Sequence, residues 1–149
     1  MITALDCALR LLAATGVGMV IGANRDLSGK PIGMRTLALV SLGAAAVATA
    51  GIGFGDLASH PDALSRVMQG VIQGTLTGIG FVGGGVILRD TQEHKVHGLT
   101  TAATVWVTAA LGIACALAAW TIVGVGTVMT ILILYGLQRA ELYIYPDDK

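Results

Sequence analysis

The chain has 149 residues, of which 54% are hydrophobic and only 12% are charged, and its nine basic and nine acidic side chains cancel. A typical soluble domain carries about 25% charged residues, so this composition excludes an ordinary soluble fold. The balanced charge also provides no field that would attract nucleic acid. Glycine is frequent, with 21 residues and no collagen period, which is typical of closely packed transmembrane helices. The sequence therefore predicts an all-α integral membrane protein.

Uncharged segments predict about five transmembrane helices within one domain at residues 1–140, followed by a short cytoplasmic tail at 141–149. The predicted spans are 11–24 (extended outward to Cys7), 36–55, 67–88, about 99–119 and about 121–138. Pro61 and Asp62 suit the first turn of a helix, so the third helix is expected to begin there, before it enters the membrane.

The last two spans come from one long run without charge, between Lys95 and Arg139. As a single helix, at 1.5 Å per residue, that run would be about 64 Å long, whereas the hydrocarbon core is about 30 Å thick. The run must therefore fold back into two helices. The expected break is near Trp120, because tryptophan is enriched at membrane interfaces.

Basic residues in the short loops predict the orientation of the chain in the membrane. Lysine and arginine concentrate in the first loop, the third loop and the tail, whereas the second loop carries Arg66 alone and the fourth carries none. Because basic loops stay in the cytoplasm, the N-terminus is expected outside and the C-terminus inside.

The ends of the first and third predicted helices resemble each other. Thr15–Gly22 matches Thr77–Gly84, and each segment is followed by an Arg-Asp pair and then by a Gly-x-x-Thr motif that opens the next helix. The match needs small gaps. We hypothesise that helices one and two, and helices three and four, are parallel repeats related by a pseudo-twofold axis along the membrane normal, with the fifth helix outside.

This repeat places polar residues at the cytoplasmic ends of the helices. A helix N-terminus presents unpaired N–H groups and a partial positive charge. Asp26 and Asp90 would cap the N-termini of the second and fourth helices, which is the simpler interpretation. Alternatively, these ends and the neighbouring Arg and Thr side chains would bind an anion. The candidate junction consists of Asn24, Arg25, Asp26, Arg35, Thr36, Arg89, Asp90, Gly98, Thr100 and Thr101.

Small residues recur at helical spacing in two of the predicted helices. Gly70, Gly74 and Gly78 share one face of the third helix, and Gly18 and Gly22 share one face of the first. Such rows let helix backbones approach closely in lipid. Packing within the chain is the simpler interpretation, and a dimer interface or a pore wall is the alternative.

Four further polar side chains fall inside predicted spans. Asp6 and Arg10 form an i, i+4 pair in the outer part of the first helix, and Gln69 and Gln73 lie in the third. An ionisable residue at such depth is a functional candidate, although Arg10 can also extend its head group outward. The glutamines would line a water path or bond between helices. No span carries a carboxylate deep inside, which argues against Mg²⁺ binding there. The three histidines, His60, His94 and His97, fall in loops and do not recur with Cys or carboxylates at a metal-ligand spacing, so the sequence predicts no metal site, no cofactor and no catalytic group.

Four stretches resemble the MgtC/SapB membrane proteins, and the resemblance runs from about Arg10 to Gly112. They are Ile21–Asp26, Gly33–Thr36, Gly78–Ile87 and Val96–Trp106. The resemblance implies a multi-pass protein of the bacterial cytoplasmic (inner) membrane, associated with low magnesium, acid stress and survival in host cells. It also implies action by binding other membrane proteins, including ATP synthase, rather than by carrying Mg²⁺.

Two departures from the family pattern limit what can be carried over. The family usually has Glu before the arginine of the first loop, where this chain has Asn24. Many members also carry a soluble cytoplasmic domain after the last helix, whereas this chain ends at Lys149, shortly after the fifth predicted span. The resemblance therefore does not carry over to this chain a site that needs that carboxylate or a role that depends on that domain.

The sequence thus predicts a non-enzymatic membrane protein in magnesium homeostasis and stress adaptation. Its expected partners are the lipid bilayer, other membrane proteins and further copies of itself in a homo-oligomer, but not nucleic acid. The competing hypothesis is a small oligomeric transporter or channel for Mg²⁺ or another small solute, with its gate at the repeated junctions. A third hypothesis is a purely structural membrane module.

Overall fold

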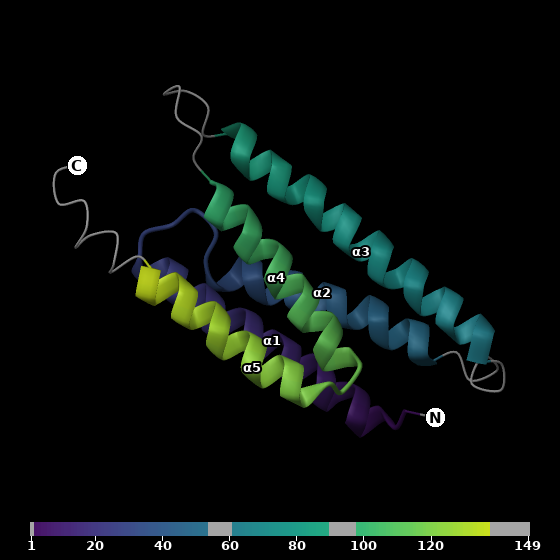
Figure 1. The fold of residues 1–149 in the computed structure, drawn as a ribbon. Helices are drawn as coiled ribbons and strands as arrows, with labels where there is room; N and C mark the ends of the chain where they lie inside the picture. Colours follow the sequence, from purple (N-terminus) through teal and green to yellow (C-terminus); the bar gives the residue numbers. More distant parts are fainter. Residues whose placement is uncertain (1, 54–60, 90–97, 138–149) are drawn as a thin grey trace, which may run out of the picture.

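A computed structural model describes residues 2–53, 61–89 and 98–137. The helices are α1 (Ala4–Leu27), α2 (Met34–Gly53), α3 (Pro61–Arg89), α4 (Leu99–Ala116) and α5 (Trp120–Leu132), and α5 continues as a π-helix, η3 (Ile133–Leu137). The described segments contain helices and no strand, which confirms the all-α prediction. In Figure 1, α2 and α4 cross in the middle of the bundle, with α1 and α5 on one side and α3 on the other.

Four of the helices are long and apolar enough to cross a membrane: α1, α2, α4 and the part of α3 between Asp62 and Ile87. The apolar helix from Trp120 to Gly136 is shorter. Two boundary predictions are confirmed, because α3 begins at Pro61 and the fourth and fifth helices separate between Ala116 and Trp120. The protein is a multi-pass membrane protein.

Tight turns join the helices at both ends of the bundle. Gly29, in the turn from α1 to α2, has a φ of 65°, a left-handed conformation that glycine adopts without strain. Between α4 and α5 this conformation falls on Ala118, with a φ of 54°. The short connection sends α5 back antiparallel to α4, as the long uncharged run required.

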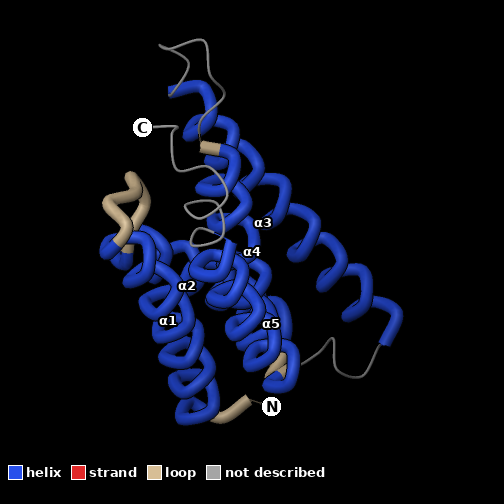
Figure 2. Tube along the Cα trace, turned by 60° about the vertical axis from the view of Figure 1, so that its left-hand side comes forward, coloured by secondary structure: helices blue, strands red, loops and turns tan. Residues whose placement is uncertain are grey.

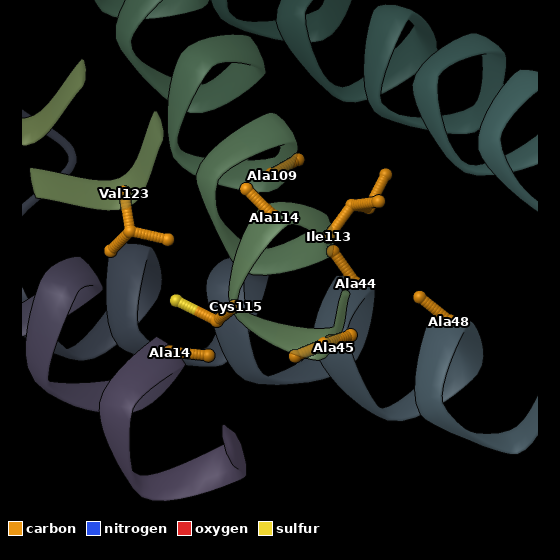
Figure 3. Packing of buried hydrophobic residues seen from close by; sticks show 10 residues of the cluster. Ala14, Ala44, Ala45, Ala48, Ala109, Ile113, Ala114, Cys115 and Val123 are labelled. Carbon is orange, nitrogen blue, oxygen red and sulfur yellow. The ribbon is translucent and has the colours of Figure 1, made fainter. Parts of the chain in front are cut away.

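Alanine dominates the contact between the central helices. Ala14 of α1, Ala44, Ala45 and Ala48 of α2, and Ala109 of α4 are buried together, and Figure 3 shows these short side chains between the helix backbones. Ile113, Cys115 and Val123 complete the cluster from α4 and α5. Because lipid supplies no hydrophobic force between helices, such packing relies on close backbone approach.

Glycines bring three pairs of backbone segments together. A Cβ at Gly18 or Gly22 of α1 would lie within 3.0 Å of α2 backbone atoms, at Leu37 and Met34 respectively. A Cβ at Gly112 of α4 would meet the Ser41 backbone equally closely. Both glycines singled out in the first helix therefore lie at the contact between α1 and α2.

The glycine row of α3 behaves differently. A Cβ at Gly70, Gly74 or Gly78 would find no atom within 4 Å in the described part of the chain, and all three residues are exposed. The simpler interpretation, packing of this row within the chain, therefore does not hold for the described residues. The row lies on the outer side of the bundle.

The two helix pairs of the proposed repeat, α1 with α2 and α3 with α4, each have a glycine contact at an equivalent position. Gly18 of α1 approaches Leu37 of α2, and Gly83 of α3 approaches Ala102 of α4, with its added Cβ 3.3 Å from the Ala102 Cβ. In both hairpins the glycine precedes its contact by the same number of residues. This equivalence supports the hypothesis of a repeat. By this contact Gly18 corresponds to Gly83, whereas the sequence motif aligns Gly18 with Gly80, three residues earlier.

Candidate functional junction

Arg25 connects three segments at the end of α1. Its Nε donates a hydrogen bond to the carbonyl oxygen of Ile32 at 3.2 Å, and its Nη2 donates to Oγ1 of Thr101 in the first turn of α4. Arg25 and Thr101 are each only 4% exposed. The guanidinium therefore joins α1, the connection to α2 and the start of α4 in one buried contact.

The turn after α1 holds Arg25 in this position. The N–H of Lys30 donates to the carbonyl oxygen of Arg25 at 3.0 Å, and the N–H of Ser28 donates to that of Asn24 at 3.1 Å. These bonds satisfy carbonyl groups that a helix end leaves unpaired. Because the backbone groups of this turn bond to one another, the Arg25 side chain can extend to α4 and bond to Thr101.

Asp26 caps the next helix and is not paired with Arg25 in the described structure. Its Oδ2 accepts a hydrogen bond from the N–H of Met34, the first residue of α2, at 2.9 Å. A carboxylate at this place satisfies an unpaired N–H and stabilises the positive end of the helix. Gly33 makes room for it, because a Cβ there would overlap the carboxylate of Asp26.

The remaining junction residues divide into buried and exposed groups. Asn24 is 5% exposed, beside Arg25, whereas Arg35, Thr36 and Thr100 are exposed. Gly98 precedes α4 with a φ of 88°, and no side chain of a described residue caps that helix. Arg89 is the last residue of α3, and Asp90 lies outside the described residues. The structure therefore brings Arg25 and Thr101 together in the interior, and Asn24, the residue before Arg25, is buried as well.

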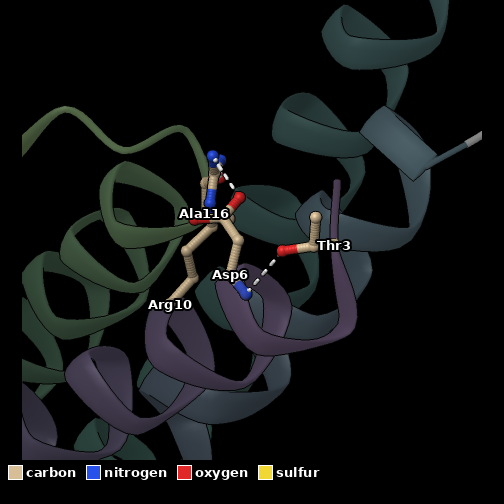
Figure 4. A network of polar contacts seen from close by, with 4 residues as sticks. All are labelled: Thr3, Asp6, Arg10 and Ala116. Atoms are coloured by element: carbon tan, nitrogen blue, oxygen red, sulfur yellow. Dashed lines mark hydrogen bonds and ion pairs between the residues drawn. The ribbon is translucent and has the colours of Figure 1, made fainter. Parts of the chain in front are cut away.

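A second arginine holds the opposite end of α4. Nη1 of Arg10 donates to the carbonyl oxygen of Ala116, the last residue of α4, and Nη2 forms an ion pair with Oδ2 of Asp6 at 2.8 Å (Figure 4). The Arg10 side chain is 15% exposed, so its head group is turned into the protein. A cation at a helix C-terminus stabilises the partial negative charge of the last carbonyl groups. The sequence revealed the pair with Asp6, but a backbone acceptor on a distant helix left no sequence signal.

Buried hydroxyl groups form a further polar feature of the central helices. Oγ1 of Thr104 donates to the carbonyl oxygen of Thr100 at 2.7 Å, and Oγ1 of Thr108 donates to that of Thr104 at 2.8 Å. In α2, the hydroxyl groups of Ser41 and Thr49 are buried and make no hydrogen bond in the described structure. The signal that could have identified them is a hydroxyl residue inside a long apolar span.

The polar residues of α3 lie on its outer side. Gln69 and Gln73 are exposed and make no hydrogen bond to a described residue. They are therefore separate from the junction residues. No group of three His, Cys, Asp or Glu side chains comes together within residues 2–53, 61–89 and 98–137.

Chemically, the interior of the junction offers donors. A buried guanidinium and the N-terminus of α4 are both positive, and the hydroxyl group of Thr101 lies between them as the acceptor for Arg25. This arrangement can tie helices together or attract an anion. Mg²⁺ prefers carboxylate and water oxygens, which the buried described residues of the junction do not supply.

Comparison with known proteins places this architecture in a family. Residues 11–143 match the model described as the MgtC family. The chain is 43% identical to protein SrpB of Synechococcus elongatus, over 92% of this chain and 78% of SrpB. It is 39% identical to protein MgtC of Salmonella typhimurium, over 73% of this chain and 42% of MgtC.

A further relative carries a functional name. The chain is 37% identical to the putative magnesium transporter YhiD of Escherichia coli, over 83% of this chain and 56% of YhiD. The chain thus spans about half the length of MgtC and YhiD, and no solved structure matches it. Because the family model covers most of the sequence, the chain belongs to the MgtC family.

Proposed function

We propose that this protein supports magnesium homeostasis and stress adaptation in the bacterial inner membrane without catalysing a reaction, by binding other membrane proteins. Membership of the MgtC family supports a magnesium-related role at the level of the family. In this proposal Arg25 and the turn from α1 to α2 face the cytoplasm, in agreement with the basic residues of that connection.

The buried Arg25 is the observation that favours binding over conduction of Mg²⁺. Arg25 is 4% exposed, and its guanidinium is bonded to the connection after α1 and to Thr101 of α4, at the end where a path through these helices would open. A fixed positive charge in such a place repels a divalent cation, as arginine does in pores that exclude cations. The central helices are therefore better suited to a stable scaffold than to a Mg²⁺ path.

The contacts of Arg10 agree with this interpretation. They hold the other end of α4 through a backbone carbonyl group and Asp6, so both ends of the central helix are tied to α1. A scaffold with fixed inner helices leaves its outer helices, α3 and α5, as surfaces for other proteins. Both helices expose most of their length.

A second candidate function is passage of a small solute other than a free divalent cation. The unpaired buried hydroxyl groups of Ser41 and Thr49, together with the threonine row of α4, favour it. Such groups exchange hydrogen bonds readily with a small polar molecule. An oligomeric transporter or channel would use them within each copy or between copies.

Growth and flux measurements test the proposal together. The gene is expressed in a bacterium that lacks its own MgtC-family genes, and growth is measured at low magnesium. The same purified protein is placed in proteoliposomes with a Mg²⁺-sensitive dye inside. We expect restored growth and no Mg²⁺ entry above that of protein-free vesicles. Mg²⁺ entry above that level, or no restoration of growth by a folded protein, would overturn the proposal.

Arg25→Gln and Arg66→Gln form a matched pair for this experiment. Arg66 is an exposed residue near the start of α3, outside the junction, so its loss is expected to leave growth unchanged. Loss of Arg25 is expected to reduce growth, because the scaffold loses its buried contact. Uptake of a labelled small solute by the wild-type vesicles would instead support the second candidate.

A further inference from the structure

The outer face of α3 combines glycines with polar side chains. One side of the helix packs against the bundle through Met68, Val71, Ile72, Leu76 and Ile79. The opposite side exposes Gln69, Gly70, Gln73, Gly74, Thr77 and Gly78. These six residues, which we call the α3 face, form one continuous strip, because they recur as pairs every four residues. Figures 1 and 2 both place α3 at the side of the bundle opposite α1.

This strip lies within a membrane span. The candidate span in α3 runs from Asp62 to Ile87, and its part without charged residues runs from Val67 to Ile87, so Gln73 and Gly74 lie inside that part. A side chain exposed there is in contact with lipid and not with water, and its polar groups are desolvated as completely as in a protein core. The amides of Gln69 and Gln73 have no hydrogen-bond partner in the described structure. In lipid, such groups require a partner on another helix.

The exposed face of α5 shows what a lipid-facing surface looks like in the same molecule. Ile122, Val125, Val128, Met129 and Leu132 are each more than half exposed. An open groove of about 400 Å³ along this helix is lined almost entirely by apolar atoms. Hydrocarbon chains suit that surface without further contacts. The α3 face differs from it in composition, so the two exposed helices have different surroundings.

We propose that the α3 face is where two copies of this protein meet in the membrane. Gly70, Gly74 and Gly78 would allow the two helices to cross closely, at an angle of about 40° as in other glycine-spaced pairs. The Gln69 and Gln73 amides would form hydrogen bonds across the crossing. The proposal concerns self-association and goes beyond the proposed function, which concerns other membrane proteins.

The chemistry of the face favours a second copy over a different protein. A glutamine amide is both a donor and an acceptor, so it pairs with its own kind. Two copies inserted in the same orientation hold Gln73 at the same depth, which aligns the amides without further adjustment. The span between Val67 and Ile87 contains no charge, so nothing on this face selects an oppositely charged partner. A twofold contact of this kind uses one self-complementary patch.

Cysteine cross-linking in native membranes tests the contact. Cys7 and Cys115 are first replaced by Ser and Ala, and Gln73→Cys or Thr77→Cys is then introduced on the α3 face. Val125→Cys, on the exposed apolar face of α5, is the matched control. On oxidation we expect disulfide-linked dimers from the α3 variants, and little from the control. Equal cross-linking from both helices, or none from α3, would overturn the proposal.

A pair of leucine substitutions distinguishes loss of the contact between copies from loss of folding of the monomer. A Cβ at Gly74 of α3 or at Gly43 of α2 meets no atom within 4 Å, so both Gly74→Leu and Gly43→Leu should leave the monomer folded. With Thr77→Cys as the reporter, Gly74→Leu is expected to reduce the cross-linked dimer to the level of the α5 control, and Gly43→Leu to leave it unchanged. Dimers that persist in Gly74→Leu would contradict the proposal.

The size of the purified protein gives a measurement that needs no cross-linker. Sedimentation in detergent should give a dimer for the wild type and for Gly43→Leu, and a monomer for folded Gly74→Leu. A wild-type monomer that joins only a different membrane protein through α3 would overturn self-association. Restored growth of such a monomer at low magnesium would leave the proposed function intact, so the two failures are distinguishable.

Discussion

Arg25 and Thr101 are 76 positions apart in the sequence, yet a hydrogen bond between their side chains joins the last turn of α1 to the first turn of α4. Both residues are buried, so the bond lies inside the protein. In a bundle whose helices touch mainly through alanine and glycine, a directional bond of this kind specifies which helices are neighbours and how they are aligned along their axes. Polar contacts therefore specify the arrangement that small residues make compact.

Removing the hydroxyl of Thr101 should destabilise the bundle. Thr101→Val keeps the shape of the side chain but leaves part of a buried guanidinium without an acceptor, which costs about 1–3 kcal/mol. Thr100→Val, one residue earlier on the exposed side of α4, is the matched control and should cost much less. The free energy of unfolding of each variant is measured by titration with SDS in mixed micelles. Equal stability of the two variants would contradict the importance of the bond.

A methyl group at Gly18 should separate α1 from α2. The added Cβ would meet the backbone of Leu37 and Ala38, which cannot move aside as a flexible side chain does. Gly18→Ala is therefore expected to cost about 1–3 kcal/mol, the usual effect of overpacking. Gly16→Ala, on the same helix with no atom within 4 Å, should have no such cost. The same SDS titration compares the two, and a stable Gly18→Ala protein would show that the helices are not in close contact.

Substitutions of Asp26 and Gly33 at the cap of α2 should have non-additive effects on the free energy of unfolding. Asp26→Ala removes the acceptor for the N–H of Met34 and should cost about 0.5–2 kcal/mol, as loss of a helix cap does. Gly33→Ala should cost a similar amount, because its methyl group displaces the same carboxylate. Once Asp26 is absent, the methyl group at residue 33 has less to displace. The double variant should therefore lose less stability than the sum of the single variants, and strict additivity would contradict this explanation.

Arg10 should matter more than its ion-pair partner Asp6. Arg10→Met removes a charged hydrogen bond to the carbonyl oxygen of Ala116 as well as the ion pair, and hydrogen bonds of charged groups contribute about 1.5–3 kcal/mol. Asp6→Asn removes only the ion pair, and the Asp6 side chain is 42% exposed, so its loss should have a small effect. Unfolding of the two variants in SDS ranks them. A larger loss for Asp6→Asn would reverse the assigned roles.

The membrane spans could be predicted from the sequence because their signal is local. Charge-free stretches are needed wherever a helix crosses lipid, and a run too long for one crossing must be divided. The break beside Trp120 and the start of α3 at Pro61 follow from the properties of those residues alone. Location of Asp26 ahead of the second helix likewise suggested a cap, and the structure shows its bond to Met34.

Contacts between distant segments could not be predicted, because they depend on which helix faces meet. Arg25 and Asp26 are adjacent, yet one reaches α4 and the other caps α2. Gly18 and Gly74 belong to rows of similar spacing, yet the first touches a backbone and the second faces outward. Spacing shows that a helix can be approached closely, but the approaching partner is decided by the whole bundle.

The two arginine contacts have a mechanical consequence for α4. Arg10 and Arg25 lie 15 residues apart on α1, and their acceptors, Ala116 and Thr101, lie 15 residues apart on α4, running in the opposite direction. A slip of one helical turn, about 5.4 Å, would break both contacts at once. Sliding of α4 along α1 is thus opposed at both ends. In the described structure, α3 and α5 have no comparable side-chain hydrogen bond to another helix, so they are held to the bundle by packing alone.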